Sequence, residues 1–307
     1  MSESAESDAT HAASHNRNCV PIPGGTARRN FALTAERSST TPCKPRSLVL
    51  GLDPLPGNVL DVCEYGFTEM LNNAVDHSES DNAIVNISYT AKQVHMSVVD
   101  LGIGIFNKIK NKFGLEDERE GILELAKGKL TTDPAHHTGE GIFFTSRMFD
   151  SFVIGSGGLG FVHRVDEDWL IENNAPTVNG TSVVMEIAMK SKRRKNDVFD
   201  QFTSSPDFWF SKTHVPLSLA RYGNENLVSR SQAKRVLSRF DRFQEVFLDF
   251  SGVESIGQAF SDEIFRVYRD NHPETKMVWI NTTPQVAQMI RRVVGDRHVL
   301  NGGGILE

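Results

Sequence analysis

Four short groups of residues in the first two thirds of the chain have types and spacings suited to nucleotide chemistry. In the first group, Glu69 and Asn73 are four residues apart, which places a carboxylate and an amide on one face of a helix. The amide oxygen can bind Mg²⁺, and the carboxylate can orient or deprotonate a water beside a phosphate. Asp76 and His77 follow at the end of the same run. Taken alone, Glu and Asn at this spacing are more typical of a solvated helix face.

The second group is an acid at the end of an apolar run. Asp100 follows the strand-like run 94–99 and precedes two spaced glycines, Gly102 and Gly104. A carboxylate at a strand end can accept a hydrogen bond from an adenine amino group, and glycines let the main chain approach a nucleotide closely. The same pattern is also a common turn, so by itself it favours a site only weakly.

The third and fourth groups are glycine turns. Gly139 and Gly141 come directly before an apolar run at 142–149, where free N–H groups and the helix dipole favour an anion such as phosphate. Gly180 and Thr181 follow Asn179 and lead into another apolar run. Most Asn-Gly pairs are hairpin turns, so this is the weakest of the four signals.

The elements that must position these groups follow from the hydrophobic periodicity. Helical spacing predicts helices over 59–78 and 142–149. Shorter apolar runs predict strands over 84–90, 94–99, 151–154, 160–165, 169–172 and 181–189. The charged, glycine-punctuated stretch from 102 to 138 predicts a long loop. The expected fold is an α+β sandwich, with helices on one face of a mixed sheet.

The last third of the chain has a different pattern. Strand-like runs at 215–220, 246–250 and 277–281 alternate with helical runs at 231–240, 260–269 and 283–294. This alternation predicts parallel strands in a small α/β domain. We therefore expect an α/β chain with domains at 47–190 and 213–300, joined by a linker at 191–212. Residues 1–46, rich in Ser, Thr, Ala and Pro, are expected to be a disordered tail.

Composition excludes several classes of protein. The chain has no uninterrupted apolar run near the roughly 20 residues of a membrane span, no basic-then-apolar leader and only three cysteines, which favours a cytoplasmic location without membrane contact. Residues 47–206 carry 14 basic and 23 acidic residues, and this excess of acids argues against direct nucleic-acid binding. The basic run at 190–195 is interpreted as a solvated linker.

The order of the four groups carries more information than any one of them. Glu-x-x-x-Asn, Asp-x-Gly-x-Gly after a strand, Gly-x-Gly before a helix and Gly-Thr before a strand occur in this order over residues 57–189. This arrangement resembles the GHKL superfamily, which includes histidine kinases, Hsp90, gyrase, MutL and the anti-sigma-factor kinases. The resemblance implies a Bergerat-type pocket that binds ATP with Mg²⁺.

The resemblance also implies a role for each residue of the four groups. Glu69 becomes the general base, Asn73 the Mg²⁺ ligand and Asp100 the acid that reads adenine. The remaining candidates for nucleotide binding are Asp76, Gly102, Gly104, Gly139, Gly141 and Thr181. Residues 106–138 would correspond to a mobile lid over the ATP, which includes His136 and His137.

The branch of the superfamily is indicated by what surrounds the ATP domain. No helical hairpin with a phosphoacceptor histidine precedes it, so the short domain is most similar to the anti-sigma-factor serine kinases. Residues 247–253 resemble the central strand and loop of STAS domains, and residues 260–265 resemble the STAS-like domains of unknown function that are fused to GHKL ATPases in bacteria. Where anti-anti-sigma factors carry a phosphorylatable serine, residues 257–260 contain no hydroxyl group.

The leading hypothesis is a bacterial regulator in which ATP binding controls protein contacts made by the STAS-like domain. One alternative is a serine/threonine kinase of the anti-sigma-factor type that acts on a separate protein, and another is a scaffold with an inactive pocket. A regulatory protein partner is expected under each hypothesis, and a homodimer is compatible with all of them. The residues leave open whether ATP is hydrolysed, transferred or only bound.

Overall fold

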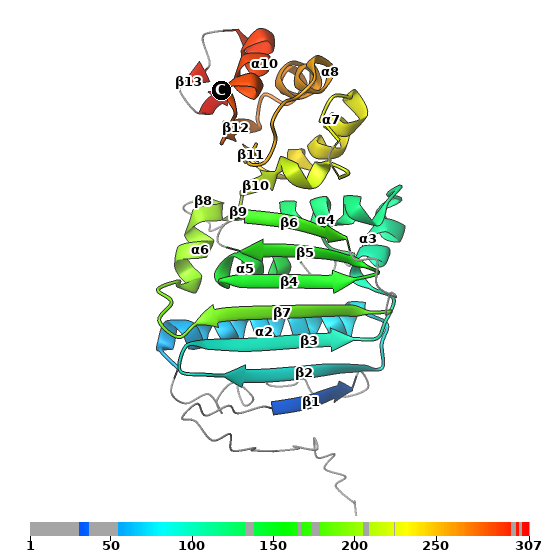
Figure 1. The fold of residues 1–307 in the computed structure, drawn as a ribbon, viewed down its shortest axis with the longest axis vertical. Coiled ribbons are helices and arrows are strands. Elements are labelled where there is room, and N and C mark those ends of the chain that lie inside the picture. Colours follow the sequence, from blue (N-terminus) through cyan, green and yellow to red (C-terminus); the bar gives the residue numbers. More distant parts are fainter. Residues whose placement is uncertain are drawn as a thin grey trace, which may run out of the picture.

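The computed structural model describes residues 31–36, 55–132, 138–164, 167–172, 179–204, 209–223, 225–295, 299–300 and 303–306. These residues form a seven-stranded sheet and a five-stranded sheet, each with helices packed against it, and a two-stranded pairing between them (Figure 1). The larger sheet belongs to the first predicted domain and the smaller one to the second.

The seven-stranded sheet has the order β1-β2-β3-β7-β4-β5-β6. Its strands are β1 (Phe31–Glu36), β2 (Asn82–Tyr89), β3 (Gln93–Asp100), β4 (Ser151–Ser156), β5 (Leu159–Arg164), β6 (Glu167–Glu172) and β7 (Thr181–Ala188). The strands from β2 to β7 confirm the six predicted runs. Every described pairing in this sheet is antiparallel, so the expectation of a mixed sheet was wrong. Short turns join β2 to β3 and β4 to β5, and such turns connect antiparallel neighbours.

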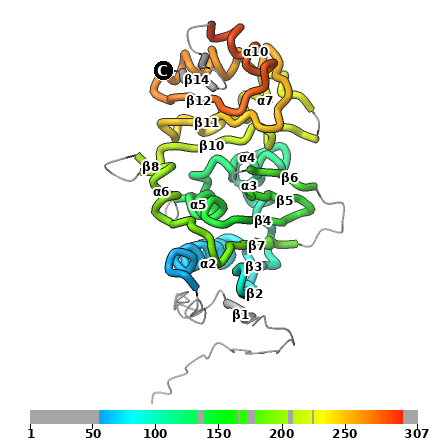
Figure 2. The backbone as a smooth tube through the Cα atoms, turned by 60° about the vertical axis from the view of Figure 1, so that its left-hand side comes forward, coloured from blue at the N-terminus to red at the C-terminus, as the bar shows by residue number. Residues whose placement is uncertain are grey.

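Two helices cover one face of this sheet, as Figures 1 and 2 show. They are α2 (Gly57–His77) and α5 (Gly141–Met148), close to the bounds predicted for them. The inward face of α2 includes the fully buried Val62 and Phe67, and α5 contributes Phe143 and Phe144. Alternate residues of β3 are buried beneath the helices, the pattern of a strand with one face in a core. The sandwich predicted from periodicity is present.

The stretch predicted to be a long lid loop is mostly helical. It contains α3 (Ile105–Phe113) and α4 (Glu118–Lys127). Gly114 ends α3 in the left-handed conformation, and the Asp117 carboxylate caps α4 by accepting a hydrogen bond from the N–H of Arg119. Gly104, Gly114 and Gly128 are therefore helix boundaries rather than marks of a continuous loop. His136 and His137 lie outside the described residues.

Two further segments differ from the predicted domain limits. Strand β1 lies within residues 1–46, which were expected to be disordered, and it pairs with β2 because that edge offers free main-chain groups. The predicted linker contains α6 (Lys195–Phe202), β8 (Thr203–Ser204) and β9 (Trp209–Phe210). Phe199 and Phe202 of α6 pack on the aromatic rings of α5. Helix α6 thus packs on the first domain through one face, where Val198 is buried.

The second domain confirms the predicted parallel strands. β10 (Lys212–Pro216), β11 (Glu245–Asp249) and β12 (Lys276–Ile280) pair in parallel, while β14 (Gly303–Leu306) pairs antiparallel with β12 and with β13 (Val299–Leu300). The predicted strand at 215–220 was wrong for four of its six residues: only residues 215–216 lie in β10, and Leu217–Ala220 form a 3-10 helix that starts after Pro216.

The helices of this domain lie close to their predicted positions. α7 (Arg230–Leu237) begins with a capping box made by Ser229 and Gln232. A continuous helix over 258–271 consists of α8 (Gln258–Asp262), a π-helical segment η3 (Glu263–Tyr268) and α9 (Arg269–Asn271). α10 (Pro284–Val294) starts after the cap residue Thr283, as predicted. A short 3-10 helix η2 (Phe240–Arg242) follows α7.

Candidate functional site

One pocket of the first domain lies between α2, the ends of β3 and β7, and the segments around α3 and α5. The space between the lining atoms amounts to about 1040 Å³, including the part that is open to solvent. Seven of the nine residues that the sequence singled out line it: Glu69, Asn73, Asp100, Gly104, Gly139, Gly141 and Thr181. The four sequence groups, although spread over more than 100 residues, therefore meet at one place.

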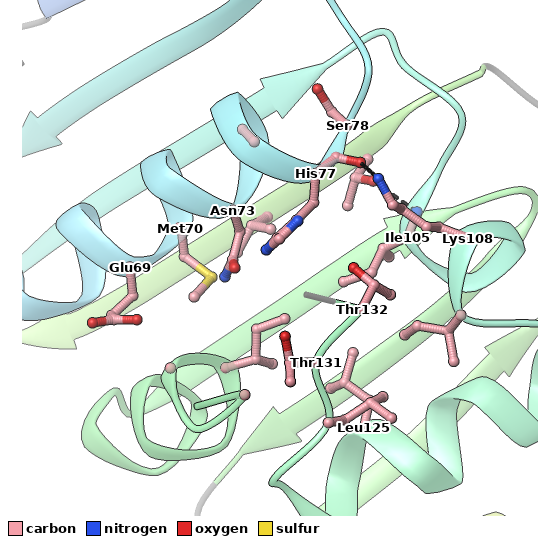
Figure 3. A pocket seen from close by; sticks show the side chains of 18 of the residues that line it. Glu69, Met70, Asn73, His77, Ser78, Ile105, Lys108, Leu125, Thr131 and Thr132 are labelled. Atoms are coloured by element: carbon pink, nitrogen blue, oxygen red, sulfur yellow. Dashed lines mark hydrogen bonds between the residues drawn. The ribbon is translucent and has the colours of Figure 1, made fainter. Parts of the chain in front are cut away.

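Helix α2 supplies one wall of the pocket. Glu69, Asn73 and His77 recur every four residues, so they share a face of α2, and Figure 3 shows all three side chains on the pocket side. Met70 stands between them and is buried. Asp76 is exposed and does not line the pocket, because it lies on another side of the helix. The interpretation of Asp76 as a nucleotide-binding residue is therefore not supported by its position.

Asp100 forms the deep end of the pocket. It is the last inward-facing residue of β3, after Val94, Met96 and Val98, and it is 5% exposed. Its Oδ1 atom accepts hydrogen bonds from the N–H groups of Gly102 (3.0 Å) and Thr181 (3.2 Å). Burial raises the pKa of Asp100, and these hydrogen bonds act in the opposite direction. A carboxylate has about four acceptor positions, so Asp100 can bind a further donor.

The two glycines after Asp100 let the chain turn tightly. A Cβ atom on Gly102 would overlap the carbonyl oxygen of Ser78 at the end of α2, and the N–H of Ile103 donates to that same oxygen (2.9 Å). Gly104 has a φ of 81° and precedes α3. Gly102 itself does not line the pocket, since its close approach is to the protein. Gly102 contributes to the site because the absence of a side chain lets the end of β3 lie directly against the end of α2.

The Gly180-Thr181 turn completes the deep end. Thr181 Oγ1 accepts a hydrogen bond from the N–H of Ile105 (3.0 Å), which joins β7 to the start of α3. The carbonyl of Gly180 accepts from Ser156 Oγ (2.8 Å). Gly180 has a φ of 102°, and a Cβ atom there would collide with the carbonyl oxygen of Asp100. The weakest sequence signal is therefore one of the most constrained turns of the site.

The start of α5 forms the opposite end of the pocket. The carboxylate of Glu69 lies against Gly141, where a Cβ atom would collide with Glu69 Oε2. Gly139 has a φ of 74°, and its carbonyl accepts a hydrogen bond from the N–H of Leu130 (3.1 Å). Burial raises the pKa of Glu140; the charge of Lys129 lowers it and that of Glu69 raises it further. Two carboxylates thus lie close together where a helix begins.

Several lining residues were not predicted. Lys108 of α3 donates from Nζ to the carbonyl of His77 (2.6 Å) and contacts Glu79 (3.3 Å), so it ties α3 to the C-terminal end of α2 (Figure 3). Thr131 and Thr132 face α2 from the other side of the pocket. The spacing of His77 from Asn73 was a signal that could have identified it. Nothing in the sequence pattern distinguishes Lys108 or the two threonines from surface residues.

Within the described ranges, no group of three or more His, Cys, Asp or Glu side chains forms a metal site. Two side chains that line the pocket carry oxygen atoms that could bind a metal ion: the Asn73 amide and the Glu69 carboxylate. Mg²⁺ is often held by one or two protein oxygens together with phosphates and water. The pocket therefore has the type of ligands for Mg²⁺ bound through a nucleotide.

Comparison with known proteins concerns the second domain. Residues 232–287 match the family model of a STAS-like domain of unknown function (DUF4325). The match runs from α7 into α10 and includes β11 and β12. No curated protein matches the chain. The match does not extend to residues 57–189, so the resemblance to GHKL ATPases stays a prediction. Among the described helices, none has the length and apolar character needed to cross a membrane.

The parallel strands of the STAS-like domain end at a buried acid. Asp249 Oδ1 accepts hydrogen bonds from the N–H and hydroxyl of Ser251 and from Asn281 Nδ2, and Oδ2 contacts His214 Nε2 at 3.0 Å. Burial alone would raise the pKa of Asp249, but the hydrogen bonds from His214, Ser251 and Asn281 hold it well below its ordinary value. The carboxylate joins β10, β11 and the turn after β12.

Replacing Asp249 with asparagine should lower the free energy of unfolding by about 1–3 kcal/mol at pH 7, because hydrogen bonds to a charged acceptor are lost. The lowered folded-state pKa means that this stabilisation is present above the unfolded pKa of about 4 and is lost as the pH falls through the folded-state value. Urea unfolding from pH 7 to pH 2.5 should therefore show the wild type and the variant converging below about pH 4. Asp270→Asn, at an exposed acid, should change stability by less than about 0.5 kcal/mol.

Proposed function

We propose that residues 57–189 form a Bergerat-type domain of the GHKL superfamily that binds Mg·ATP in this pocket. We further propose that the chain is a regulator in which nucleotide binding controls the contacts of the STAS-like domain with another protein. The four sequence groups support this proposal because they converge on one pocket in the order typical of that superfamily.

The observation that carries the proposal is that a buried acid and polar side chains of α2 line one pocket. Asp100 is buried at the deep end, while Glu69 and Asn73 line the wall that leads to α5. A buried carboxylate is costly unless it is hydrogen-bonded, and Asp100 retains an acceptor position beyond its two main-chain donors. The adenine amino group is a donor of the right kind for that position.

The other end of the pocket fits phosphates and a metal ion. Gly139 and Gly141 precede α5, and the N–H groups of a helix start favour anions. Asn73 supplies a neutral oxygen for Mg²⁺, while bound Mg²⁺ would offset the negative charges of Glu69 and Glu140 near the phosphates. Thr181 lies beside Asp100, at the end assigned to adenine.

A kinase acting on a separate protein is the second candidate function. It is favoured by the contact of Glu69 with the start of α5, where the γ-phosphate would lie within reach of a base. No hydroxyl occurs at residues 257–260 of the STAS-like domain, where anti-anti-sigma factors carry their phosphorylatable serine, which argues against phosphorylation at that turn. A scaffold with an inactive pocket predicts no effect of Mg·ATP on the protein.

Asp100→Asn tests the nucleotide assignment. The substitution keeps an oxygen for the N–H groups of Gly102 and Thr181 but places an amide donor where adenine would also present one. We expect the affinity for Mg·ATP to fall by about 10- to 100-fold, the usual range for leaving a buried polar group unpaired. Isothermal titration of the full chain measures this affinity, and circular dichroism checks that the variant is folded.

Asp76→Asn is the matched control, because it removes an acid from α2 that does not line the pocket. Its affinity for Mg·ATP should stay within about 2-fold of the wild type. Wild-type affinity in folded Asp100→Asn would remove Asp100 from the site. A wild-type chain that does not bind Mg·ATP would instead support the scaffold hypothesis.

A further inference from the structure

Helix α4 is held against the STAS-like domain by buried charges. Lys127 is fully buried and donates from Nζ to Glu124 Oε1 (2.6 Å) and to the carbonyls of Arg235 (2.9 Å) and Ser238 (3.1 Å) at the end of α7. Glu124 also pairs with Arg239 Nε at 2.5 Å. Figure 2 shows α4 between the larger sheet and β10. The two domains therefore share a desolvated ionic contact, which has strict geometric requirements.

Arg239 does more than pair with an acid. Its guanidinium donates to the main-chain carbonyls of Glu124 (2.6 Å), Gly128 (3.2 Å) and Lys129 (2.9 Å). Arg242 adds a bond to the carbonyl of Lys129 at 3.3 Å. A guanidinium presents five donors in a rigid plane, so one side chain can fix several carbonyls at once. Arg239 thus holds the chain at the point where it leaves α4.

Lys129 and Arg239, which are joined by one of these hydrogen bonds, both have an unusual main-chain conformation. Lys129 has a φ of 50° and Arg239 a φ of 62°, the left-handed region that residues other than glycine rarely occupy. Of the described residues other than glycine, only Glu79 and Asn281 also have positive φ. Such conformations persist where the surroundings over-determine them, and they cluster at functional sites. Here the two strained residues bond to each other across the domain contact.

The held segment continues directly into the pocket wall. Leu130, Thr131 and Thr132 follow Lys129 and line the pocket. The N–H of Leu130 donates to the carbonyl of Gly139. A Cβ atom added to Gly139 would overlap the main chain of Leu130, so the two segments lie in close contact. An unbroken set of contacts therefore leads from Arg239 through Lys129 and Leu130 to the glycines at the start of α5.

We propose that Arg239 of the STAS-like domain is a positioning residue for the nucleotide pocket, because it fixes the main chain at residues 128–129 and thereby the wall formed by residues 130–132. The inference rests on the proposed function for its link to ATP. It makes nucleotide affinity in the first domain depend on the docking of the second domain. Linkage requires the reverse effect as well, so bound nucleotide strengthens the docking.

Arg239→Ala and Arg235→Ala form a matched pair of variants. Both remove an arginine that crosses the domain contact and pairs with α4, since Arg235 contacts Glu120 at 3.1 Å. The described hydrogen bonds of the Arg235 side chain go to Glu120 and Tyr222, and none of them goes to residues 128–132. We expect Mg·ATP affinity to fall by about 5- to 30-fold in Arg239→Ala, within the usual range of coupling between sites, and to change by less than about 2-fold in Arg235→Ala.

Hydrogen exchange of the full chain without nucleotide provides a readout that is independent of ATP binding. Amides of residues 130–132 and 139–141 should exchange faster in Arg239→Ala than in Arg235→Ala. In the wild type, Mg·ATP should slow the exchange of residues 235–242. Arg239→Lys keeps the charge but cannot bridge several carbonyls, so it should resemble Arg239→Ala in exchange, and it serves as the test if the alanine variant does not fold.

The outcomes separate this inference from the proposed function. Equal exchange and equal affinity in the two alanine variants would overturn the positioning role of Arg239 while leaving ATP binding intact. A wild-type chain that fails to bind Mg·ATP would overturn the proposed function, and faster exchange confined to the Arg239 variants would then still support the positioning of the wall.

Discussion

Replacing Gly180 with alanine should lower the free energy of unfolding by about 3 kcal/mol or more. Gly180 has a φ of 102°, a conformation that residues other than glycine rarely adopt. The added Cβ atom would also collide with the carbonyl oxygen of Asp100 in the neighbouring strand. To avoid this collision, β3 and β7 must move apart at their ends, where the N–H of Thr181 donates to Asp100. Strain and overpacking each cost about 1–3 kcal/mol, so the combined effect is among the largest expected for one methyl group. Urea unfolding measures it.

Gly155→Ala provides the control for this prediction. Gly155 lies in β4 opposite Ser182 of β7, one strand away from the Gly180 turn, and a Cβ atom there would have no neighbour within 4 Å. Its stability should stay within about 1 kcal/mol of the wild type. If both variants were equally stable, the turn at Gly180 would not be constrained as described, and the hydrogen bonds that orient Asp100 would lose their support.

The predicted secondary structure was most accurate where one face of an element is buried. The periodicity of Val62, Phe67 and Met70 located α2, and the alternation of Val94, Met96 and Val98 located β3. These patterns arise because core contacts select residues at a fixed spacing. In the second domain, the apolar runs located β11 and β12, whereas β10 was predicted only at its last two residues because it begins with Lys212, Thr213 and His214.

The errors arose where tertiary contacts decide the structure. Helix α4 has buried residues on several sides, including Glu124 and Lys127, because it is enclosed between two domains. A one-sided periodicity is therefore missing, and the charges suggested a solvated loop. Strand β1 forms by pairing with β2, although its local sequence resembles a disordered tail. Neither partner can be inferred from the segment alone.

The candidate site was predictable in part for a comparable reason. Residue types that serve nucleotide chemistry occur in recognisable local motifs, so Glu69, Asn73 and Asp100 could be selected from spacing. Lys108 enters the pocket through a helix that was not predicted. The contact of Arg239 with Lys129 joins residues 110 positions apart, and no local pattern indicates it. Motifs thus identified the chemical groups, whereas the fold was needed to identify what holds them.

If the pocket binds and turns over Mg·ATP as proposed, replacing Glu69 with glutamine should slow the loss of the γ-phosphate by at least about 100-fold. A positioned general base contributes about 10²- to 10⁴-fold, and glutamine keeps the shape of the side chain without its basicity. Affinity for Mg·ATP should change by only a few-fold, because the substitution removes no contact assigned to adenine. Single-turnover assays with γ-labelled Mg·ATP, with and without a protein acceptor, measure both release and transfer.

Glu140→Gln is the informative control for the Glu69 variant. The two acids lie close enough that the charge of Glu69 raises the pKa of Glu140, yet Glu69 lines the pocket and Glu140 does not. A base must reach the reacting water, whereas a neighbouring charge only alters the local field, so Glu140→Gln should slow turnover by less than about 5-fold. A larger effect from Glu140 than from Glu69 would reverse the assignment of the base. If the wild type binds Mg·ATP but the label stays on the nucleotide, the chain is either a switch or a kinase that lacks its substrate protein, and adding candidate protein acceptors to the assay separates the two.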